Sequence, residues 1–225
     1  MKYPDDFINQ IITGDCLEAM KLIPDKSIDL VLTDPPYGLG YDKQASVRGG
    51  QQYGNAAAPK KHYDLTDWDK LPSREYFNEI IRVSKNQIIF GGEHLCLMLP
   101  KSRGWIVWDK HTGENNFSDC ELAWTSYDKP IKKYDWIWNG MIQQNMKEKE
   151  ERYHPTQKPL GLFKKILFDY VKDDALVLDC FLGSGTTAVA CKELDRRFIG
   201  IEKEPKYVAI AKERLRILDM QPRLL

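Results

Sequence analysis

The stretch VLDCFLGSGTTA, residues 177–188, decides the fold of this chain. A short apolar run ends at an acid, a bend with two glycines follows, and Thr186 opens a segment with helical spacing that runs to Leu194. After it, FIGIE at residues 198–202 is a second apolar run that ends at an acid, Glu202. Strand, glycine bend, helix and strand follow one another in a nucleotide-binding βαβ unit, in which an acid about 20 residues beyond the glycines reaches a ribose. The stretch therefore predicts a parallel α/β sheet with a ligand site at the glycine bend.

Outside this unit, short apolar runs alternate with helical patterns, which is typical of an α/β protein with a mostly parallel sheet. The predicted strands are 11–13, 28–33, 87–91, 105–108, 122–125, 175–179 and 198–201. The predicted helices are 15–23, 74–84, 160–171, 186–194 and 205–218. Two stretches show no period: 38–64 is glycine-rich, and 126–152 is polar and aromatic. We therefore expect one domain over residues 1–225, with these two stretches as a loop and an insertion.

Composition narrows the classes of function. The 225 residues carry 33 basic and 33 acidic side chains, which excludes a uniformly basic nucleic-acid coat but not a local basic groove. The five cysteines contain no C-x-x-C and the four histidines no H-x-x-x-H pair, so we predict no metal site. No apolar run approaches the roughly 18 residues of a membrane span. The start, MKYPDDFINQ, also lacks the apolar core of a signal peptide, so we expect a cytoplasmic protein.

The predicted strand 28–33 runs directly into Asp34, Pro35, Pro36 and Tyr37. Ligands of open α/β sheets bind beyond the carboxyl ends of the strands, so this tetrapeptide lies at the expected mouth of a site. A carboxylate and a free proline carbonyl are acceptors suited to the two N–H groups of an exocyclic amine on a planar base. Hydrogen bonds to both would localise the nitrogen lone pair, while Tyr37 stacks on the base. The alternative is an Asx-type turn with Tyr37 in the core.

A third motif is HPTQKP, residues 154–159, just before the predicted helix 160–171. Its lysine, Lys158, lies at a predicted helix start, where it is available to a ligand carboxylate. Thr156 is also an ordinary helix cap with proline nearby, and that interpretation needs no ligand. The glycine bend alone fits a nicotinamide-dependent dehydrogenase as well, but such an enzyme leaves 34–37 and 154–159 unexplained.

Taken in order, DPPY at 34–37, HPTQKP at 154–159 and FLGSGTT at 181–187 resemble the motifs of the β-class amino-methylating DNA methyltransferases, the N-4/N-6 DNA methylase family. The resemblance spans residues 11–217. It implies a Rossmann-like methyltransferase fold: a seven-stranded, mostly parallel sheet with helices on both faces, with a permuted order in which the catalytic motif precedes the glycine loop. It also implies methyl transfer from S-adenosyl-L-methionine to the amino group of a flipped base in double-stranded DNA. The leading Asp, where cytosine-amino enzymes commonly carry Ser, makes the chain most like the adenine-N6 members. Cytosine-N4 methylation is the alternative, and a nicotinamide-dependent oxidoreductase is the distant one.

Site residues are carried over by position from this resemblance. The catalytic candidates, which would hold the amino group and stack on the base, are Asp34, Pro35, Pro36 and Tyr37. The cofactor-binding candidates are Asp15, Cys16, Asp34, Thr156, Gln157, Lys158, Asp179, Phe181, Gly183, Ser184, Gly185, Thr186, Thr187 and Glu202. Among these, Glu202 would hold the ribose, and residues 156–158 would close over the methionine carboxylate. Asp15 has a strong alternative, because Asp15 with Glu18 also fits a helix capping box.

The DNA surface is expected in the two aperiodic stretches. The stretch 38–64 fits a flexible, DNA-facing loop, because no acid lies between Lys43 and Tyr63 to offset its basic residues; a solvated loop is the alternative. The stretch 126–152 occupies the place of a short target-recognition insertion. The DNA-contacting candidates are Arg48, Lys60, Lys61, Lys132 and Lys133. A homodimer and a cognate restriction nuclease are the other partners that the resemblance suggests.

Overall fold

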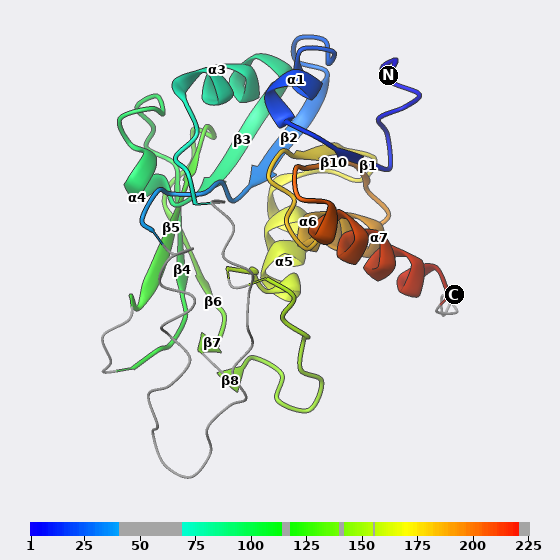
Figure 1. Cartoon of the computed structure of the whole chain (residues 1–225). Coiled ribbons are helices and arrows are strands. Elements are labelled where there is room, and N and C mark those ends of the chain that lie inside the picture. Colours follow the sequence, from blue (N-terminus) through cyan, green and yellow to red (C-terminus); the bar gives the residue numbers. More distant parts are fainter. Residues whose placement is uncertain (41–68, 114–117, 140–141, 155, 221–225) are drawn as a thin grey trace.

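The computed structural model describes residues 1–40, 69–113, 118–139, 142–154 and 156–220 (Figure 1). The strands are β1 (Gln10–Thr13), β2 (Ile28–Thr33), β3 (Ser84–Phe90), β4 (Trp105–Asp109), β5 (Cys120–Thr125), β6 (Lys132–Asp135), β7 (Trp138–Asn139), β8 (Ile142–Gln143), β9 (Leu176–Asp179) and β10 (Arg197–Glu202). The helices are α1 (Cys16–Met20), α3 (Arg74–Val83), α4 (Gly92–Leu95), α5 (Leu160–Tyr170), α6 (Thr186–Glu193) and α7 (Pro205–Met220). Among the described residues, eight strands form one sheet in the order β1-β10-β9-β2-β3-β5-β4-β6, and β7 pairs with β8 in a separate ribbon.

The two strands that lead into the DPPY motif and the glycine loop lie side by side. β2 and β9 are parallel neighbours, with Leu30 opposite Val177 and Val31 opposite Leu178. β10 pairs in parallel with β9 on its other side. Both strands are mainly apolar, and all their residues except Asp29 are buried, as expected of parallel strands covered on both faces. Since the carboxyl ends of parallel strands meet at one edge, the residues that follow β2, β9 and β10 converge there.

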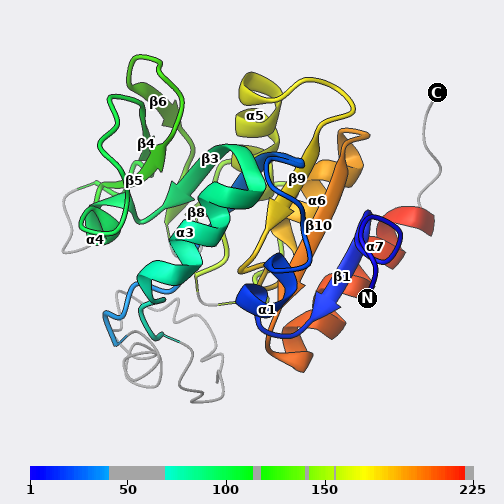
Figure 2. The same cartoon turned by 90° about the horizontal axis from the view of Figure 1, so that it is seen from above.

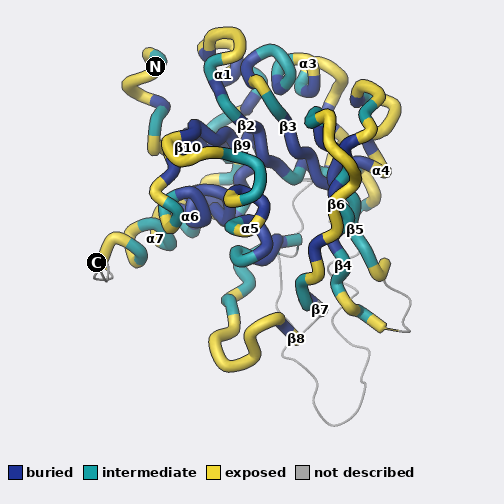
Figure 3. The backbone as a smooth tube through the Cα atoms, turned by 180° about the vertical axis from the view of Figure 1, so that it is seen from behind, coloured by how far each residue is buried: buried dark blue, intermediate teal, exposed yellow. Residues whose placement is uncertain are grey.

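Helices cover both faces of the sheet (Figure 2). α5, α6 and α7 share one hydrophobic core with Leu30 and Leu32 of β2, whereas α1, α3 and α4 share the other core with Val31. Successive residues of a strand point to opposite faces, so β2 contributes to both cores. α6 is buried along most of its length because it lies between α5 and α7 (Figure 3). This packing fixes the position of the glycine loop that immediately precedes α6.

The predicted α/β fold is confirmed, and all seven predicted strands and five predicted helices are present. Helix α3 leads into β3 without a loop, because the strand begins at Ser84 rather than at Gln87. At the far end of the sheet, β5 is antiparallel to both β3 and β4. Within the described ranges, no helix combines the length and apolar character that crossing a bilayer demands.

The predicted number of strands is wrong, because the described residues alone place eight strands in the sheet where the sequence predicted seven. The additional strand, β6, lies inside the stretch 126–152 and pairs in parallel with β4. Its sequence KKYD has one buried residue, Tyr134, among three exposed ones. A single apolar residue gives no alternating pattern, so nothing in the sequence indicated a strand. The Tyr134 hydroxyl donates to Asp169 of α5 at 2.7 Å, which links this edge strand to the helix layer.

Candidate active site

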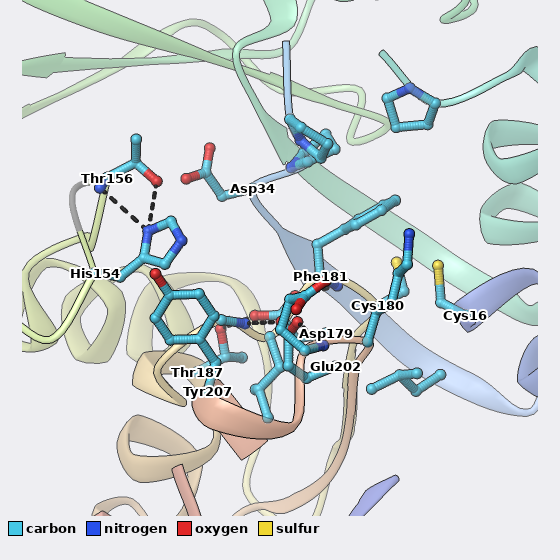
Figure 4. Close-up of a pocket in the computed structure, with 18 of the residues that line it drawn as sticks. Cys16, Asp34, His154, Thr156, Asp179, Cys180, Phe181, Thr187, Glu202 and Tyr207 are labelled. Carbon is cyan, nitrogen blue, oxygen red and sulfur yellow. Dashed lines mark hydrogen bonds between the residues drawn. The ribbon is translucent and has the colours of Figure 1, made fainter. Parts of the chain in front are cut away.

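One cavity of about 350 Å³ lies at the carboxyl ends of β2, β9 and β10. The DPPY motif, the HPTQKP loop and the glycine loop all contribute to its wall, although they are far apart in the sequence (Figure 4). Of the residues predicted from the sequence, those that line the cavity are Asp15, Cys16, Asp34, Pro35, Pro36, Tyr37, Thr156, Gln157, Lys158, Asp179, Phe181, Gly183, Ser184, Thr186, Thr187 and Glu202. The structure therefore brings the predicted catalytic and cofactor-binding residues to one place.

The glycine loop is shaped by Glu202, at the end of β10. Its Oε2 atom accepts from the Gly183 N–H at 2.7 Å, and its Oε1 atom accepts from the Glu204 N–H at 2.8 Å. Gly183 has φ +53°, a left-handed conformation that favours glycine. Burial raises the pKa of Glu202, while the backbone donors oppose that shift. Glu202 thus lies in the wall, where a ribose was predicted, and also fixes the loop backbone.

Gly185 was predicted to contact the cofactor, but it does not line the cavity. It has φ +90°, and a Cβ atom placed on it would lie 2.7 Å from the Cβ of Ala211 in α7. Gly185 also precedes the first residue of α6. Its role is therefore the close packing of α6 against α7, a role that the G-x-G pattern could not distinguish from ligand contact.

Asp179 forms the floor of the cavity, where β9 ends. Its carboxylate accepts from the Thr33 hydroxyl at 2.7 Å, from the Phe181 N–H at 3.1 Å and from the Thr187 hydroxyl. These bonds join β2, the glycine loop and α6 through one buried side chain. Burial raises the pKa of Asp179 to about 6, although the three donors oppose the shift. Such a perturbed carboxyl at a strand end is typical of a functional site.

Asp34 approaches the cavity from the end of β2. One carboxylate oxygen accepts from the Tyr37 hydroxyl, and the other contacts Nζ of Lys158 at 2.6 Å. Burial raises the pKa of Asp34, whereas the charge of Lys158 lowers it. The Asp34 side chain is 18% exposed. It is therefore an acceptor held in a largely enclosed place, where hydrogen bonds to a charged group are strong.

The turn after Asp34 is held by contacts with residues that are distant in the sequence. Oδ1 of Asp69 accepts from the backbone N–H groups of Tyr37 at 3.1 Å and of Gly38 at 2.9 Å. The Tyr37 ring lies against the backbone of Gly91, where an added Cβ would meet the ring at 2.0 Å. It also lies beside His94, with the two ring centroids 5.1 Å apart. Gly91 is thus a glycine because Tyr37 occupies the space of a side chain.

Lys158 has a different partner from the predicted one. Its Nζ atom lies 2.6 Å from Asp34 and 3.3 Å from Oε2 of Glu121, so it contacts protein carboxylates rather than lying free for a ligand carboxylate. The side chain is only 7% exposed. Burial opposes the charge of Lys158, but Asp34 and Glu121 raise its pKa above the ordinary value. Glu121, in β5, is a residue of this site that sequence reasoning missed, because a single acid beside a predicted strand gives no signal.

The rest of the HPTQKP loop is joined to the glycine loop. Oε1 of Gln157 accepts from the Ser184 hydroxyl at 2.9 Å and from the Tyr153 N–H at 3.0 Å. Nδ1 of His154 lies 3.0 Å from the Thr156 hydroxyl, and burial with the charge of Lys158 lowers the pKa of His154 to about 4. The alternative of Thr156 as a helix cap is wrong, since Pro159 is the N-cap of α5. Neutral His154 and Thr156 therefore form one side of the cavity (Figure 4).

Asp15 serves as a helix cap and as a cavity residue at once. Its Oδ1 atom accepts from the Leu17 N–H at 2.8 Å, which confirms Asp15 as the N-cap of α1, whereas the Glu18 carboxylate pairs with Lys21. Its Oδ2 atom accepts from the Tyr76 hydroxyl at 2.6 Å. Tyr76 and Phe181 lie beside one another with ring centroids 6.0 Å apart, and both line the cavity. This end of the cavity is therefore aromatic with an acid at its edge.

The predicted DNA-contacting residues that the structure describes, Lys132 and Lys133, do not line this cavity. Arg48, Lys60 and Lys61 lie outside the described residues. Lys132 and Lys133 lie on β6, and each contacts carboxylates of its own chain. The shortest distances are 3.2 Å from Lys132 Nζ to Asp169, 2.8 Å from Lys133 Nζ to Asp109 and 3.0 Å from Lys133 Nζ to Asp135. Part of the charge of both lysines is thus balanced within the protein.

Comparison with known proteins gives a consistent set of matches. A family model described as DNA methylase, for the N6 and N4 methyltransferases, matches residues 106–213. The type II methyltransferase M.HinfI of Haemophilus influenzae is 28% identical, covering 97% of this chain and 71% of that protein. The type II methyltransferase M2.MboI of Moraxella bovis is also 28% identical, covering 93% of this chain and 88% of that protein.

Among solved structures, the M1.HpyAVI–SAM complex superposes with a TM-score of 0.55 and 27% sequence identity, covering 92% of this chain and 98% of that one. The residues that the family model matches contain the HPTQKP motif and the glycine loop, whereas the DPPY motif at 34–37 lies outside them. The chain is thus similar to type II methyltransferases over most of its length and, over residues 106–213, to the N6 and N4 DNA methylases.

Proposed function

We propose that this protein is a DNA adenine-N6 methyltransferase that transfers the methyl group of S-adenosyl-L-methionine to an adenine flipped out of double-stranded DNA. The observation that carries the proposal is the pairing of β2 with β9. It places an acceptor, Asp34, and a nucleotide-type glycine loop on the wall of one cavity. A dehydrogenase built on the glycine loop alone has no use for the acceptor opposite it.

The cavity suits the cofactor in size and in chemistry. Its volume of about 350 Å³ lies within the range of roughly 300–1,000 Å³ that is typical of small-molecule sites. We propose that Phe181 and Tyr76 flank the adenine ring, that Asp15 and Glu202 bind its polar edges and the ribose, and that the loop at Gly183 lies along the methionine part. When bound, S-adenosylmethionine supplies an electrophilic methyl group on a sulfonium. No covalent link to the protein is required.

Asp34 and its turn are proposed to activate the target amine. The Asp34 carboxylate and the Pro35 carbonyl accept hydrogen bonds from the two amino N–H groups, which localises the lone pair on nitrogen and aims it toward the cofactor side of the cavity. With the cofactor bound, the amine would displace a neutral thioether from the methyl group, and the surplus proton of the methylated amine would pass to the Asp34 carboxylate that accepts its hydrogen bond. Tyr37 stacks on the base. The chain contributes position and fixed acceptors, which together supply a large share of such rate enhancements.

The target base is proposed to be adenine rather than cytosine, on the leading Asp34 of the motif. A base within a duplex is out of reach of this enclosed acceptor, so it must be extruded at a cost of a few kcal/mol. We propose that residues 38–64 contact DNA and that 126–152 recognise a short or relaxed target sequence. A homodimer, a cognate restriction nuclease and a cytoplasmic location stay predictions from the sequence.

Labelled methyl transfer tests the proposal. Duplex DNA of defined sequence is incubated with the protein and methyl-labelled S-adenosylmethionine, then digested to nucleosides. We expect label in N6-methyl-2′-deoxyadenosine. Label in N4-methyl-2′-deoxycytidine would establish the cytosine alternative. Absence of transfer, together with binding of a nicotinamide cofactor in a titration, would overturn the proposal in favour of an oxidoreductase.

A further inference from the structure

Four side chains of alternating charge run from the Asp34 carboxylate away from the cavity: Asp34, Lys158, Glu121 and Lys110. Nζ of Lys158 lies 2.6 Å from Asp34 and 3.3 Å from Glu121. On the far side, Nζ of Lys110 lies 3.1 Å from the other oxygen of Glu121. The exposed fractions of these side chains are 18%, 7%, 27% and 14% in the same order. We call this row the charge chain.

The charge chain is assembled from separate parts of the fold. Asp34 follows β2, Glu121 lies in β5, Lys110 follows β4, and Lys158 precedes α5. β5 pairs with both β3 and β4, which brings Glu121 and Lys110 to the same edge of the sheet as the acceptor turn. Glu121 is not part of the cavity wall. It can therefore affect the reaction only through the groups that it holds.

Lys158 is shared between two carboxylates. An ammonium that faces Asp34 alone, in an enclosed place, binds that carboxylate strongly and weakens it as an acceptor for other protons. When a second carboxylate contacts the same ammonium, the ammonium binds the first carboxylate less strongly. Glu121 is itself held by Lys110, so its carboxylate stays in position beside Lys158. The result is a neutral row in which neither carboxylate has Lys158 to itself.

We infer that Glu121 is a positioning residue for methyl transfer: by sharing the ammonium of Lys158, it leaves the Asp34 carboxylate a strong acceptor for the amino protons of the target base. The inference rests on the proposed function, since it assigns Asp34 that task. It gives Glu121 no contact with base or cofactor. Lys158 is correspondingly the group that Glu121 holds, rather than a clamp on the methionine carboxylate.

The charges around Asp34 shift its pKa in directions that can be measured. Burial raises the pKa of Asp34, Lys158 lowers it, and Glu121 raises it. The Tyr37 hydroxyl, from the same turn, lowers it further. The other ionisable groups nearby are Asp179 at the end of β9, His154 beside Lys158, and Glu93 of α4, which faces Tyr37. Removing Glu121 and removing Lys158 should therefore shift the proton affinity of Asp34 in opposite directions.

The test is the titration of Asp34 in protein labelled with ¹³C at the aspartate carboxyl carbon, without cofactor or DNA. The Asp34 signal is assigned as the one lost in Asp34→Asn. Glu121→Gln should lower the titration midpoint of Asp34 by about one pH unit, and Lys158→Met should raise it by a similar amount. In the complete reaction, Glu121→Gln should lower kcat about tenfold and leave the Kd for S-adenosylmethionine within about twofold.

A matched control is Glu79→Gln. Glu79 of α3 pairs with Arg82 at 2.7 Å and is 19% exposed, but it lies outside the cavity wall and the charge chain. It should change neither the Asp34 midpoint nor kcat. If Glu121→Gln does not fold, Glu121→Asp, which withdraws the charge by one methylene, should give a smaller shift in the same direction.

An Asp34 midpoint that is unchanged or raised in folded Glu121→Gln or Glu121→Asp protein overturns the inference. Loss of cofactor binding in the same variant, in parallel with kcat, also overturns it, because that result assigns Glu121 a structural role. A wild-type protein that methylates no DNA would overturn the proposed function instead. The titration midpoints would still report whether the charge chain tunes Asp34.

Discussion

The two walls of the cavity use their carboxylates in different ways. On the glycine-loop wall, Asp179 and Glu202 accept from threonine hydroxyls and backbone N–H groups. On the Asp34 wall, the carboxylates of Asp34 and Glu121 meet the ammonium of Lys158. Neutral donors fix the course of a backbone, whereas a shared charge sets how strongly a carboxylate attracts a proton. Changes on the first wall should therefore impair folding or cofactor binding, and changes on the second should impair methyl transfer.

The largest effect is expected on the Asp34 wall. Asp34→Asn replaces the acceptor by an amide of the same shape and should lower the rate of methyl transfer about 10³-fold. Cofactor affinity should stay within about threefold, because the glycine-loop wall is unchanged. Single-turnover transfer and a binding titration measure the two quantities. If both were lost in a variant that unfolds at the wild-type temperature, the two walls would not be functionally separate.

On the glycine-loop wall, Asp179 predicts a pH dependence of stability. Its folded-state pKa is about 6, above the unfolded value of about 3.9, so the folded chain keeps a proton that the unfolded chain releases. The stabilisation from the protonated carboxyl is complete below about pH 4 and is lost as the pH rises through 6. The loss amounts to about 3 kcal/mol.

Denaturant unfolding of wild type and Asp179→Asn at several pH values between 4 and 7 measures this loss of stability. Wild type should lose about 3 kcal/mol of unfolding free energy relative to the variant as the pH rises. If the difference in unfolding free energy stays constant across this pH range, the pKa of Asp179 is not raised in the folded protein.

The two glycines of the loop form a matched pair. Gly185→Ala should destabilise the fold by about 2 kcal/mol or more, because its Cβ would meet Ala211 in a left-handed conformation. Gly183→Ala places a Cβ with nothing within 4 Å, so it should cost only the backbone strain of about 1 kcal/mol. Urea unfolding compares the two. Equal losses would mean that the packing of α6 on α7 does not depend on Gly185.

The smallest effect is expected from the Tyr37 hydroxyl. Tyr37→Phe removes one hydrogen bond to Asp34, worth about 1 kcal/mol, but keeps the ring that is proposed to stack on the base. We expect kcat/KM for DNA to change less than about fivefold. Tyr37→Ala also removes the stacking, worth about 1–3 kcal/mol, and should cost about 10- to 100-fold. A Phe variant as impaired as the Ala variant would assign the hydroxyl the main role.

The glycine-loop wall was largely predictable from the sequence, because its signals are local. A strand, its terminal acid Asp179, the glycines and the next helix follow one another within residues 177–188. The same holds for Asp34, which follows its strand directly. Gly185 shows the limit even here, since its conformation is local but its contact with Ala211 comes from the packing of α7.

The charge chain was not predictable, because its members meet only through the sheet. Glu121 reaches Lys158 because β5 pairs between β3 and β4, and no spacing in the sequence encodes that position. β6 was missed for a related reason: its one buried residue, Tyr134, is stabilised by a contact with α5 rather than by an alternating pattern. The position of Glu121 and the formation of β6 both depend on contacts between residues that are far apart in the sequence.

The most direct test of the two-walled site is a crystal structure of the protein with sinefungin, an analogue that carries an amine in place of the sulfonium methyl. We expect its nucleoside part to lie along Phe181 and Glu202 and its amine to face Asp34 across the cavity. An analogue bound outside this cavity, or bound within it with the amine directed away from Asp34, would show that the two walls do not form one methyl-transfer site.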